Sequence, residues 1–335
     1  MQMLASLRFP AWQSLIPGVL TALTVALAAT FISEHYGGPQ LLYALFFGMA
    51  FNFLAIDPKT QPGIEFCARR VLRFGVALLG ARITLEQISA LGVLPILMVI
   101  VAVFATVGFG AWLGRVLDRS TVEGLLTGGA VAICGASAAL AISAVLPRSQ
   151  DNQRFTLLTV VGVTALSTLA MIVYPALVKV LGLETAAAGI FLGGTIHDVA
   201  QVVAAGYIIS PQAGDTATFV KLLRVTLLVP VVLLLSLKFR RQGESAAAAR
   251  PPLLPVFLMG FVALVVVNSL GLIPSAVTGW LSSLSRWCLV VAIAGLGVKT
   301  SFQDLAELGW RPVALMIGET LFLAALILGG LLTLR

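Results

Sequence analysis

The sequence predicts an all-α polytopic membrane protein, on the basis of its composition and the length of its apolar runs. Of its 335 residues, 59% are hydrophobic and only 10% are charged, and the mean hydropathy is +1.04. Soluble domains carry about a quarter charged residues. A membrane helix needs roughly 20 apolar residues, and the chain offers about eleven such runs within one transmembrane domain, 1–335. The expected runs are 14–33, 40–57, 66–81, 89–116, 121–146, 155–178, 184–209, 218–237, 253–272, 280–298 and 311–334.

The first run, 14–33, follows a short start whose only charged residue is Arg8. Its apolar core is longer than the roughly 7–15 residues of a secretory signal, so we expect a retained helix. Cys67, Cys134 and Cys288 lie in or beside apolar runs and form no C-x-x-C pair. We therefore expect neither a disulfide framework nor a metal site, and no cofactor.

Runs two to four recur near the C-terminus as runs nine to eleven. Residues 51–95 align with 267–312, and seven crossings separate the two copies. Because seven is odd, the second copy runs across the membrane in the opposite direction. This pattern predicts an inverted-topology repeat. Matched pairs include Arg69/Arg286, Gly80/Gly297, Arg82/Lys299 and Pro95/Pro312, each 217 residues apart, and Asn52/Asn268, one residue closer. The two asparagines are expected to bond across helices, with substrate contact as the alternative.

Both copies carry a helix-start pattern at the same place. Thr84 with Gln87, and Ser301 with Asp304, fit a hydroxyl cap followed three residues later by a side chain that bonds back. Each pair follows a glycine that ends an apolar run. In each copy, one helix is therefore expected to stop and another to start, near opposite membrane faces.

The fifth run contains "GGAVAICGASAALA", which has unusually many small residues. Gly128, Gly129 and Gly135 favour a break, because glycine leaves the helical region easily. Ser137 is expected to cap a half-helix whose N-terminal amides attract an anion. Alternatively, the small residues serve close helix packing, and Cys134 is expected to be a buried structural thiol.

Basic residues indicate the orientation, because cytoplasmic loops are rich in Lys and Arg. With the N-terminus in the cytoplasm, most of the 21 basic residues fall on the cytoplasmic side. Arg148 and Arg154 do not fit, since Arg115 and Arg119 precede the same run. Either the rule is soft at this place, or the fifth run is a re-entrant hairpin.

The seventh run contains "GGTIHDVAQVVAA", which again opens with a glycine pair, Gly193 and Gly194. Thr195 and Asp198 fit a T-x-x-D capping box, which predicts that a second half-helix begins inside the membrane. A helix starting there adds a second ring of amide groups able to face an anion.

Three polar residues follow in the same run: His197, Asp198 and Gln201. Helical spacing would place His197 and Gln201 on one face. Ionisable groups at membrane depth indicate a substrate or ion pathway, and histidine exchanges protons near neutral pH. The alternatives are a plain helix cap for Asp198 and, for His197, a ring satisfied by neighbouring carbonyls.

Two further features lie in the C-terminal third. Residues 238–255 are charged and then proline-rich, which predicts a cytoplasmic linker. Glu319 lies inside the last run, where we expect it to pair with Arg311 or with another helix.

The motifs "AICGASAALA" (132–141) and "GGTIHDVAQVVAAG" (193–206) resemble those of the YeiH family, also called UPF0324 and proposed to export sulfate. Segments 78–85 and 295–302 extend the resemblance over essentially the whole chain. It implies a bacterial inner-membrane protein, similar to cation:proton antiporters and bile-acid-type transporters, with inverted repeats and discontinuous helices. It also implies a secondary transporter of sulfate or a related sulfur oxyanion, and an acidic residue at the place of Asp198.

We therefore expect a carrier, not an enzyme, that exports a small anion by alternating access, coupled to a proton or cation. It would lie in the lipid bilayer of the inner membrane, with its N-terminus cytoplasmic and its C-terminus periplasmic. No nucleic acid is expected as a partner, and a homodimer is compatible with the sequence. The expected substrate-binding residues are Gly128, Gly129, Cys134, Gly135, Ser137, Gly193, Gly194, Thr195 and Gln201, with His197 and Asp198 for ion coupling.

Two other functions are considered. An anion channel would need no protonatable residue at the site and would show no counter-transport. An intramembrane hydrolase would combine Ser137 or Cys134 with His197, although the chain has no G-x-S-x-G motif.

Overall fold

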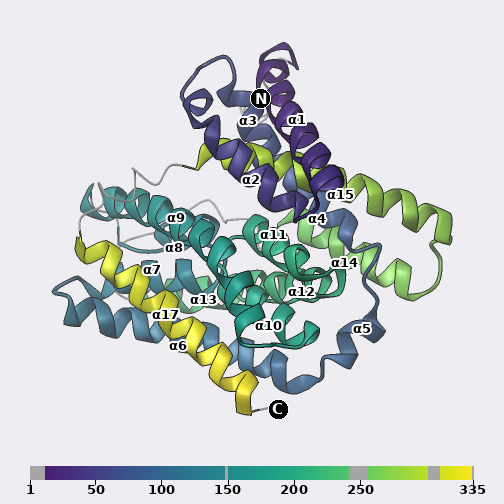
Figure 1. The fold of residues 1–335 in the computed structure, drawn as a ribbon. Helices are drawn as coiled ribbons and strands as arrows, with labels where there is room; N and C mark the ends of the chain where they lie inside the picture. Colours follow the sequence, from purple (N-terminus) through teal and green to yellow (C-terminus); the bar gives the residue numbers. More distant parts are fainter. Residues whose placement is uncertain (1–11, 148–149, 241–254, 301–309, 334–335) are drawn as a thin grey trace, which may run out of the picture.

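The computed structural model describes residues 12–147, 150–240, 255–300 and 310–333, which form helices and no strand. They make two bundles (Figure 1). The first bundle contains α1 (Trp12–Tyr36), α2 (Gln40–Ala50), η1 (Asn52–Ala55), α3 (Gln61–Phe66), η2 (Cys67–Val71), α4 (Leu72–Leu79), α14 (Val256–Ser269) and α15 (Ser275–Lys299). The second contains α6 (Val93–Val116), α7 (Thr121–Ala132), α8 (Ala136–Ser143), α9 (Gln150–Val180), α10 (Thr185–Thr195), α11 (Val199–Ile209), α12 (Pro211–Thr226), α13 (Leu228–Arg240) and α17 (Trp310–Thr333). Short α5 (Leu85–Ala90) connects them.

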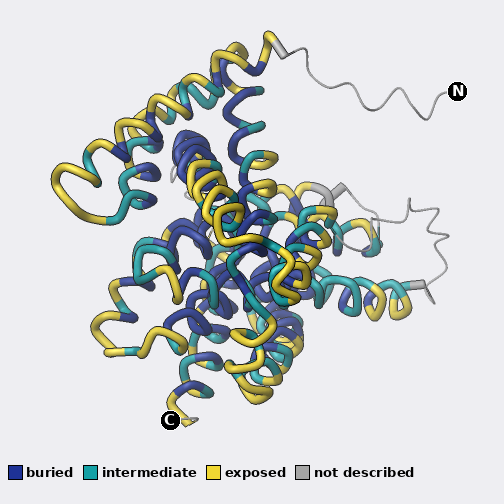
Figure 2. The backbone as a smooth tube through the Cα atoms, turned by 90° about the vertical axis from the view of Figure 1, so that its right-hand side faces the viewer, coloured by how far each residue is buried: buried dark blue, intermediate teal, exposed yellow. Residues whose placement is uncertain are grey.

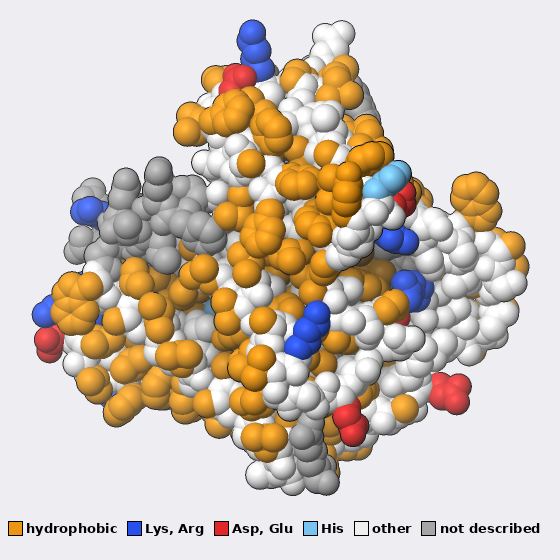
Figure 3. Space-filling model, viewed as in Figure 1, with side chains coloured by type: hydrophobic (Ala, Val, Ile, Leu, Met, Phe, Trp, Pro, Cys, Tyr) orange, Lys and Arg blue, Asp and Glu red, His pale blue; other side chains and the backbone are white. Residues whose placement is uncertain are grey.

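The surface of the described chain is that of a membrane protein. Six of its helical segments are long and apolar enough to cross a bilayer: residues 13–36, 93–116, 154–180, 211–239, 275–299 and 310–333. Large apolar side chains are exposed along them, and the face drawn in Figure 3 shows many hydrophobic and few charged side chains. Buried residues concentrate where helices meet, whereas the outer faces are exposed (Figure 2). The count of about eleven crossings stays a prediction.

The predicted run 121–146 is a helical hairpin, α7 followed by α8. A Cβ atom on Gly129 would collide with the Cδ1 atom of Ile142. In one straight helix, residues 13 positions apart would be about 20 Å apart. The chain therefore turns back at Ile133–Gly135. This is the re-entrant alternative, and it places Arg154 on the same side as Arg115, which removes the conflict with the charge rule.

The predicted run 184–209 is also a hairpin, so its interpretation as a single crossing was wrong. A Cβ atom on Gly189 of α10 would lie 2.9 Å from the carbonyl oxygen of Ala213, and one on Gly206 of α11 would lie 3.2 Å from it. A straight helix would separate the two glycines by about 25 Å. Both ends of this hairpin therefore lie at the start of α12.

The hairpins enter from opposite sides, as their contacts along α9 show. The hydroxyls of Ser143, at the end of α8, and Thr156 are 2.9 Å apart. Farther along α9, Ser167 contacts the second hairpin tip at Asp198, and the ring of Tyr174 lies 5.3 Å from that of Phe191 in α10. We call the membrane side where α1 begins the near side and the side where it ends the far side. The α10–α11 hairpin opens to the far side, because Tyr207 lines one cavity with Gly38, just after α1.

The first bundle contains reciprocal contacts between the two sequence copies. Asn52 donates to the carbonyl oxygens of Val298 (2.8 Å) and Thr300 (3.1 Å), and Asn268 donates to that of Ile83 (3.3 Å). Ile83 and Thr300 are 217 residues apart, so each asparagine satisfies the helix break of the other copy. The expected cross-helix role of both asparagines is confirmed. Reciprocal contacts of this kind agree with a two-fold relation between the two sequence copies.

The helix start predicted in the first sequence copy is confirmed. Thr84 and Gln87 form a complete capping box at the start of α5. Ser301 and Asp304 lie outside the described residues, as does most of the predicted linker 238–255.

The hairpin α7–α8 predicts the sidedness of chemical labelling. In a protein whose three cysteines are replaced by alanine, Thr121→Cys and Asn152→Cys should react from the same side with a membrane-impermeant maleimide, because the chain returns to that side. The ends of α1, tested with Gln13→Cys and Tyr36→Cys, are the control and should react from opposite sides. Opposite labelling of positions 121 and 152 would contradict the hairpin.

Candidate functional site

The turn between α7 and α8 is built by Gly135. Its φ of +61° lies in the left-handed region, which a side chain disfavours. Gly135 is also the residue before α8, so the expected capping role of Ser137 was wrong. Ser137 is exposed, whereas Cys134 is buried and not in a disulfide.

The turn between α10 and α11 also differs from the predicted capping box. Thr195 is the last residue of α10, and its hydroxyl donates to the carbonyl oxygen of Phe191. Asp198 is itself the cap of α11 and accepts from the amide of Ala200 at 3.0 Å. His197 lies in the turn, so it does not share a helix face with Gln201.

Two buried cations of α12 lie where the hairpin tips meet. The Lys221 ammonium donates to the carbonyl oxygens of Ile133 (2.5 Å) and Ile196 (2.9 Å). Arg224 is also fully buried. Its guanidinium donates to the carbonyl oxygens of Val131, Ala132, Gly193 and Ile196, at 2.8 to 3.1 Å.

These contacts join the C-terminal ends of α7 and α10. The last carbonyls of a helix have no partner within it and carry partial negative charge. Lys221 and Arg224 satisfy both ends at once. Among the described residues no carboxylate forms a salt bridge with either cation. The carboxylate of Asp198 acts on Lys221 through its charge. By formal charge, two cations therefore face one carboxylate at the meeting point.

The sequence interpretation missed this pair. Lys221 and Arg224 lie inside the predicted run 218–237, three residues apart, and therefore on one helix face. The rule applied to His197, that an ionisable residue within a membrane segment marks a functional site, identifies them equally well.

His197 connects the α10–α11 turn to two helices, α7 and α17, at the same place. Its Nδ1 lies 3.1 Å from the carbonyl oxygen of Val131, to which it donates, and its Nε2 lies 3.0 Å from the hydroxyl of Thr320 in α17. That hydroxyl is also 2.7 Å from the carbonyl oxygen of Met316. By rotating, the hydroxyl can donate to a neutral ring or accept from a protonated one.

Two other polar side chains are fully buried close by. Gln201 reaches the Thr168 hydroxyl at 3.4 Å, and its side-chain oxygen has no hydrogen-bond partner among the described residues. Glu319 accepts from Thr127 of α7 at 2.7 Å. Its pairing with another helix is thus confirmed, whereas the alternative partner, Arg311, lies 3.7 Å from Asp118.

The four paired glycines lie against helices in this structure. Gly128 packs against the backbone of Thr106 and Gly129 against Ile142. Gly193 lies against Ala217 and Gly194 against Ile327. The contacts of these glycines are therefore contacts between helices, as the alternative of close helix packing expects for Gly128 and Gly129. Their predicted role in substrate binding stays a prediction.

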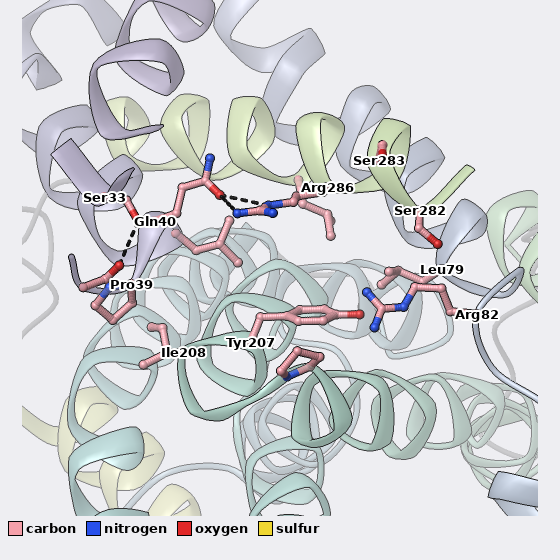
Figure 4. Close-up of a pocket in the computed structure, with 14 residues that line it drawn as sticks. Ser33, Pro39, Gln40, Leu79, Arg82, Tyr207, Ile208, Ser282, Ser283 and Arg286 are labelled. Carbon is pink, nitrogen blue, oxygen red and sulfur yellow. Dashed lines mark hydrogen bonds between the residues drawn. The ribbon is translucent and has the colours of Figure 1, made fainter. Parts of the chain in front are cut away.

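A cavity of about 480 Å³ lies between the two bundles at the far side, away from both hairpin tips (Figure 4). Tyr207 of α11 and Ile208 form one wall, and Arg286 of α15 faces them. Arg82, which follows α4, points into it beside Tyr207. None of the predicted site residues lines this cavity.

Comparison with known proteins gives the family. The profile described as "Conserved hypothetical protein 698" matches residues 17–316. A UPF0324 membrane protein of Chlorobaculum tepidum, CT0845, is 56% identical over 97% of this chain and 91% of its own length. The chain belongs to the UPF0324 family of membrane proteins. The UPF0324 membrane protein TauZ of Paracoccus denitrificans is 50% identical over 95% of both chains, and that of Corynebacterium glutamicum is 34% identical over 97% and 94%.

The buried guanidinium predicts how this UPF0324 protein responds to mutation. Arg224→Met should destabilise the fold by about 3–5 kcal/mol, because it leaves buried carbonyls without a donor. Arg224→Lys should recover only part of this loss, since an ammonium lacks the planar fork. Thermal unfolding in detergent measures both.

Arg115→Gln is the control, because Arg115 is exposed and its loss should cost less than about 0.5 kcal/mol. An unchanged melting temperature for Arg224→Met would show that the guanidinium does not hold the hairpins.

Proposed function

We propose that this UPF0324 protein is a secondary carrier that moves a small anion across the membrane by alternating access. The observation that carries the proposal is the meeting of two re-entrant hairpins at Lys221 and Arg224, both fully buried. Broken backbone at membrane depth is tolerated where protein or a polar path covers it, and transporters place their binding sites at such breaks.

The positive balance at the tips favours an anion as the substrate. Two cations face one neighbouring carboxylate, that of Asp198. The positive charges of Arg73 and Arg69 in the first bundle also act on this carboxylate. The tips also contain the N-terminal ends of α8 and α11, whose amides attract negative charge. A cation would meet repulsion at the same place.

The division into two bundles supports alternating access. α11 of the second bundle contacts α2 and α15 of the first, and it begins at the hairpin tip at Asp198. Rocking of one bundle against the other would therefore move α11 and open the site to either side in turn.

His197 and Asp198 are the proposed coupling residues. His197 touches both the first hairpin, through Val131, and α17, through Thr320. A change in its protonation would therefore reverse the hydrogen bond to Thr320 and add a charge between the two hairpin tips. Lys221 joins them as a third candidate, because buried ammonium groups exchange protons readily.

The two rival functions lack comparable support. A hydrolase would need His197 bonded to a nucleophile, but its ring nitrogens lie against Val131 and Thr320, and Ser137 is exposed. An anion channel would not need the ionisable pair at the tips. Export of sulfate or a related sulfur oxyanion, in the orientation with the N-terminus in the cytoplasm, is proposed on the family resemblance.

Counterflow in proteoliposomes tests the carrier. Vesicles are loaded with one unlabelled anion and given a trace of the same labelled anion outside, for sulfate, sulfite, ethanesulfonate and acetate at two pH values. A carrier accumulates label transiently for at least one anion. A flux that does not saturate with anion concentration, without transient accumulation of label, would indicate a channel and contradict the proposal.

Substitutions at the tip predict a loss of coupling without unfolding. Asp198→Asn keeps a residue that caps helices well but removes the charge, so proton-coupled flux should fall about tenfold or more with little change in melting temperature. His197→Ala should reduce coupled flux and flatten its dependence on pH.

Asp57→Asn, in the loop before α3, is the charge-matched control and should behave as the wild type. Normal pH-dependent flux in both tip variants would remove His197 and Asp198 from the coupling mechanism.

A further inference from the structure

The cavity between the bundles is lined by charged and apolar side chains that lie next to one another. Arg82 and Arg286 approach from two sides, with Ser282 and Ser283 beside Arg286 (Figure 4). Leu41, Leu79, Ile208 and Leu289 supply apolar surface, and Tyr207 lies between. A volume of about 480 Å³ falls in the range of small-molecule sites, about 300–1,000 Å³.

The two arginines differ in their partners. Arg286 donates to one neutral acceptor, the side-chain oxygen of Gln40, at 3.0 and 3.1 Å. Within the described residues it has no carboxylate partner. Arg82 lies 3.4 Å from one carboxylate oxygen of Asp215. The other oxygen of this carboxylate accepts a hydrogen bond from the Tyr207 hydroxyl. An arriving oxyanion would therefore replace a neutral partner at Arg286, whereas at Arg82 it would share the cation with Asp215.

The inverted repeat gives these cations counterparts at the near side. Arg286 corresponds to Arg69, and Arg82 to Lys299, each 217 residues apart. Arg69 and Lys299 lie within electrostatic range of each other and of Glu65. α4 and α15 are antiparallel, with Gly75 beside Cys288 and Cys67 beside Gly295, so the two cation pairs lie at opposite ends of one helix pair.

We propose that this cavity is the far-side loading site for a small organic anion. The oxyanion head, a sulfonate, sulfate ester or carboxylate, binds Arg286 and Arg82. The organic part of the anion packs on the apolar side chains Leu41, Leu79 and Leu289. Arg69 and Lys299 form the corresponding near-side pair. The site rests on the proposed carrier function and adds to it a substrate class and a point of entry on each side.

The chemistry of the walls decides between substrates. A guanidinium group binds two oxygens of a sulfonate or a carboxylate through paired hydrogen bonds. An inorganic ion would leave the apolar side chains of the cavity exposed to water, whereas the organic part of a larger anion would cover them. Ethanesulfonate is therefore expected to bind more tightly than sulfate.

The first test measures binding without transport. Titration calorimetry of the protein in phosphatidylcholine nanodiscs should show saturable binding of ethanesulfonate, weakened about tenfold or more in Arg286→Gln and less in Arg286→Lys. Lys179→Gln, an exposed residue at the end of α9, is the control and should bind as the wild type. Equal affinity of Arg286→Gln and wild type would overturn the loading site.

A lipid phosphate is the alternative source of an anion for the same arginines. Binding is therefore repeated in nanodiscs that contain phosphatidylglycerol. Unchanged ethanesulfonate binding supports the proposal. Its abolition by this lipid would assign the cavity to a lipid headgroup and overturn the proposal.

The second test uses the repeat. In right-side-out and inside-out membrane vesicles, Arg286→Gln should raise the KM for ethanesulfonate about tenfold from the far side only, and Arg69→Gln from the near side only. An unchanged KM from both sides, with counterflow intact, would overturn the loading site but leave the carrier. Arginine-dependent binding without counterflow would remove the carrier but leave the site.

Discussion

The structure depends on the hydrogen bonds that Lys221 and Arg224 make to the ends of two half-helices. A chain that reverses inside a membrane leaves carbonyl oxygens without partners, and each such group costs several kcal/mol in lipid. Here one helix, α12, supplies two cations that satisfy both reversals. The same bonds set the depth of each hairpin and hold the two tips together. The positions of His197, Asp198 and Cys134 follow from that junction.

The sequence indicates where the helices break but not where the chain goes next. Gly135 predicts the first break, since only glycine adopts its φ of +61° without strain. A break allows the chain either to continue or to return, and the difference depends on tertiary contacts such as Gly129 with Ile142. Thr195 was misassigned for a similar reason: a threonine hydroxyl bonds equally well to its own helix. Family membership and membrane-embedded helices were predictable, whereas the cavity, assembled from four distant segments, was not.

The repeat shows that one sequence relation serves two purposes. Asn52 and Asn268 use it structurally, because each satisfies backbone freed by the other copy. The pairs Arg82/Lys299 and Arg69/Arg286 use it electrostatically, because they place cations at both ends of the α4–α15 pair. A two-fold relation of this kind makes the far side and the near side chemically alike. Alternating access needs such likeness, since one substrate must be released to either side by small changes in packing.

The cations of the protein divide into two groups by the partners they would have to give up. Lys221 and Arg224 hold buried backbone oxygens, so a substrate that displaced them would also expose the hairpin ends. Arg286 holds one amide at the surface of a cavity, and that partner is easily exchanged for an oxyanion. In the proposed carrier, direct binding would therefore fall to Arg286, whose partner is exchangeable. The buried pair would act through its charge while it keeps its bonds to the carbonyls.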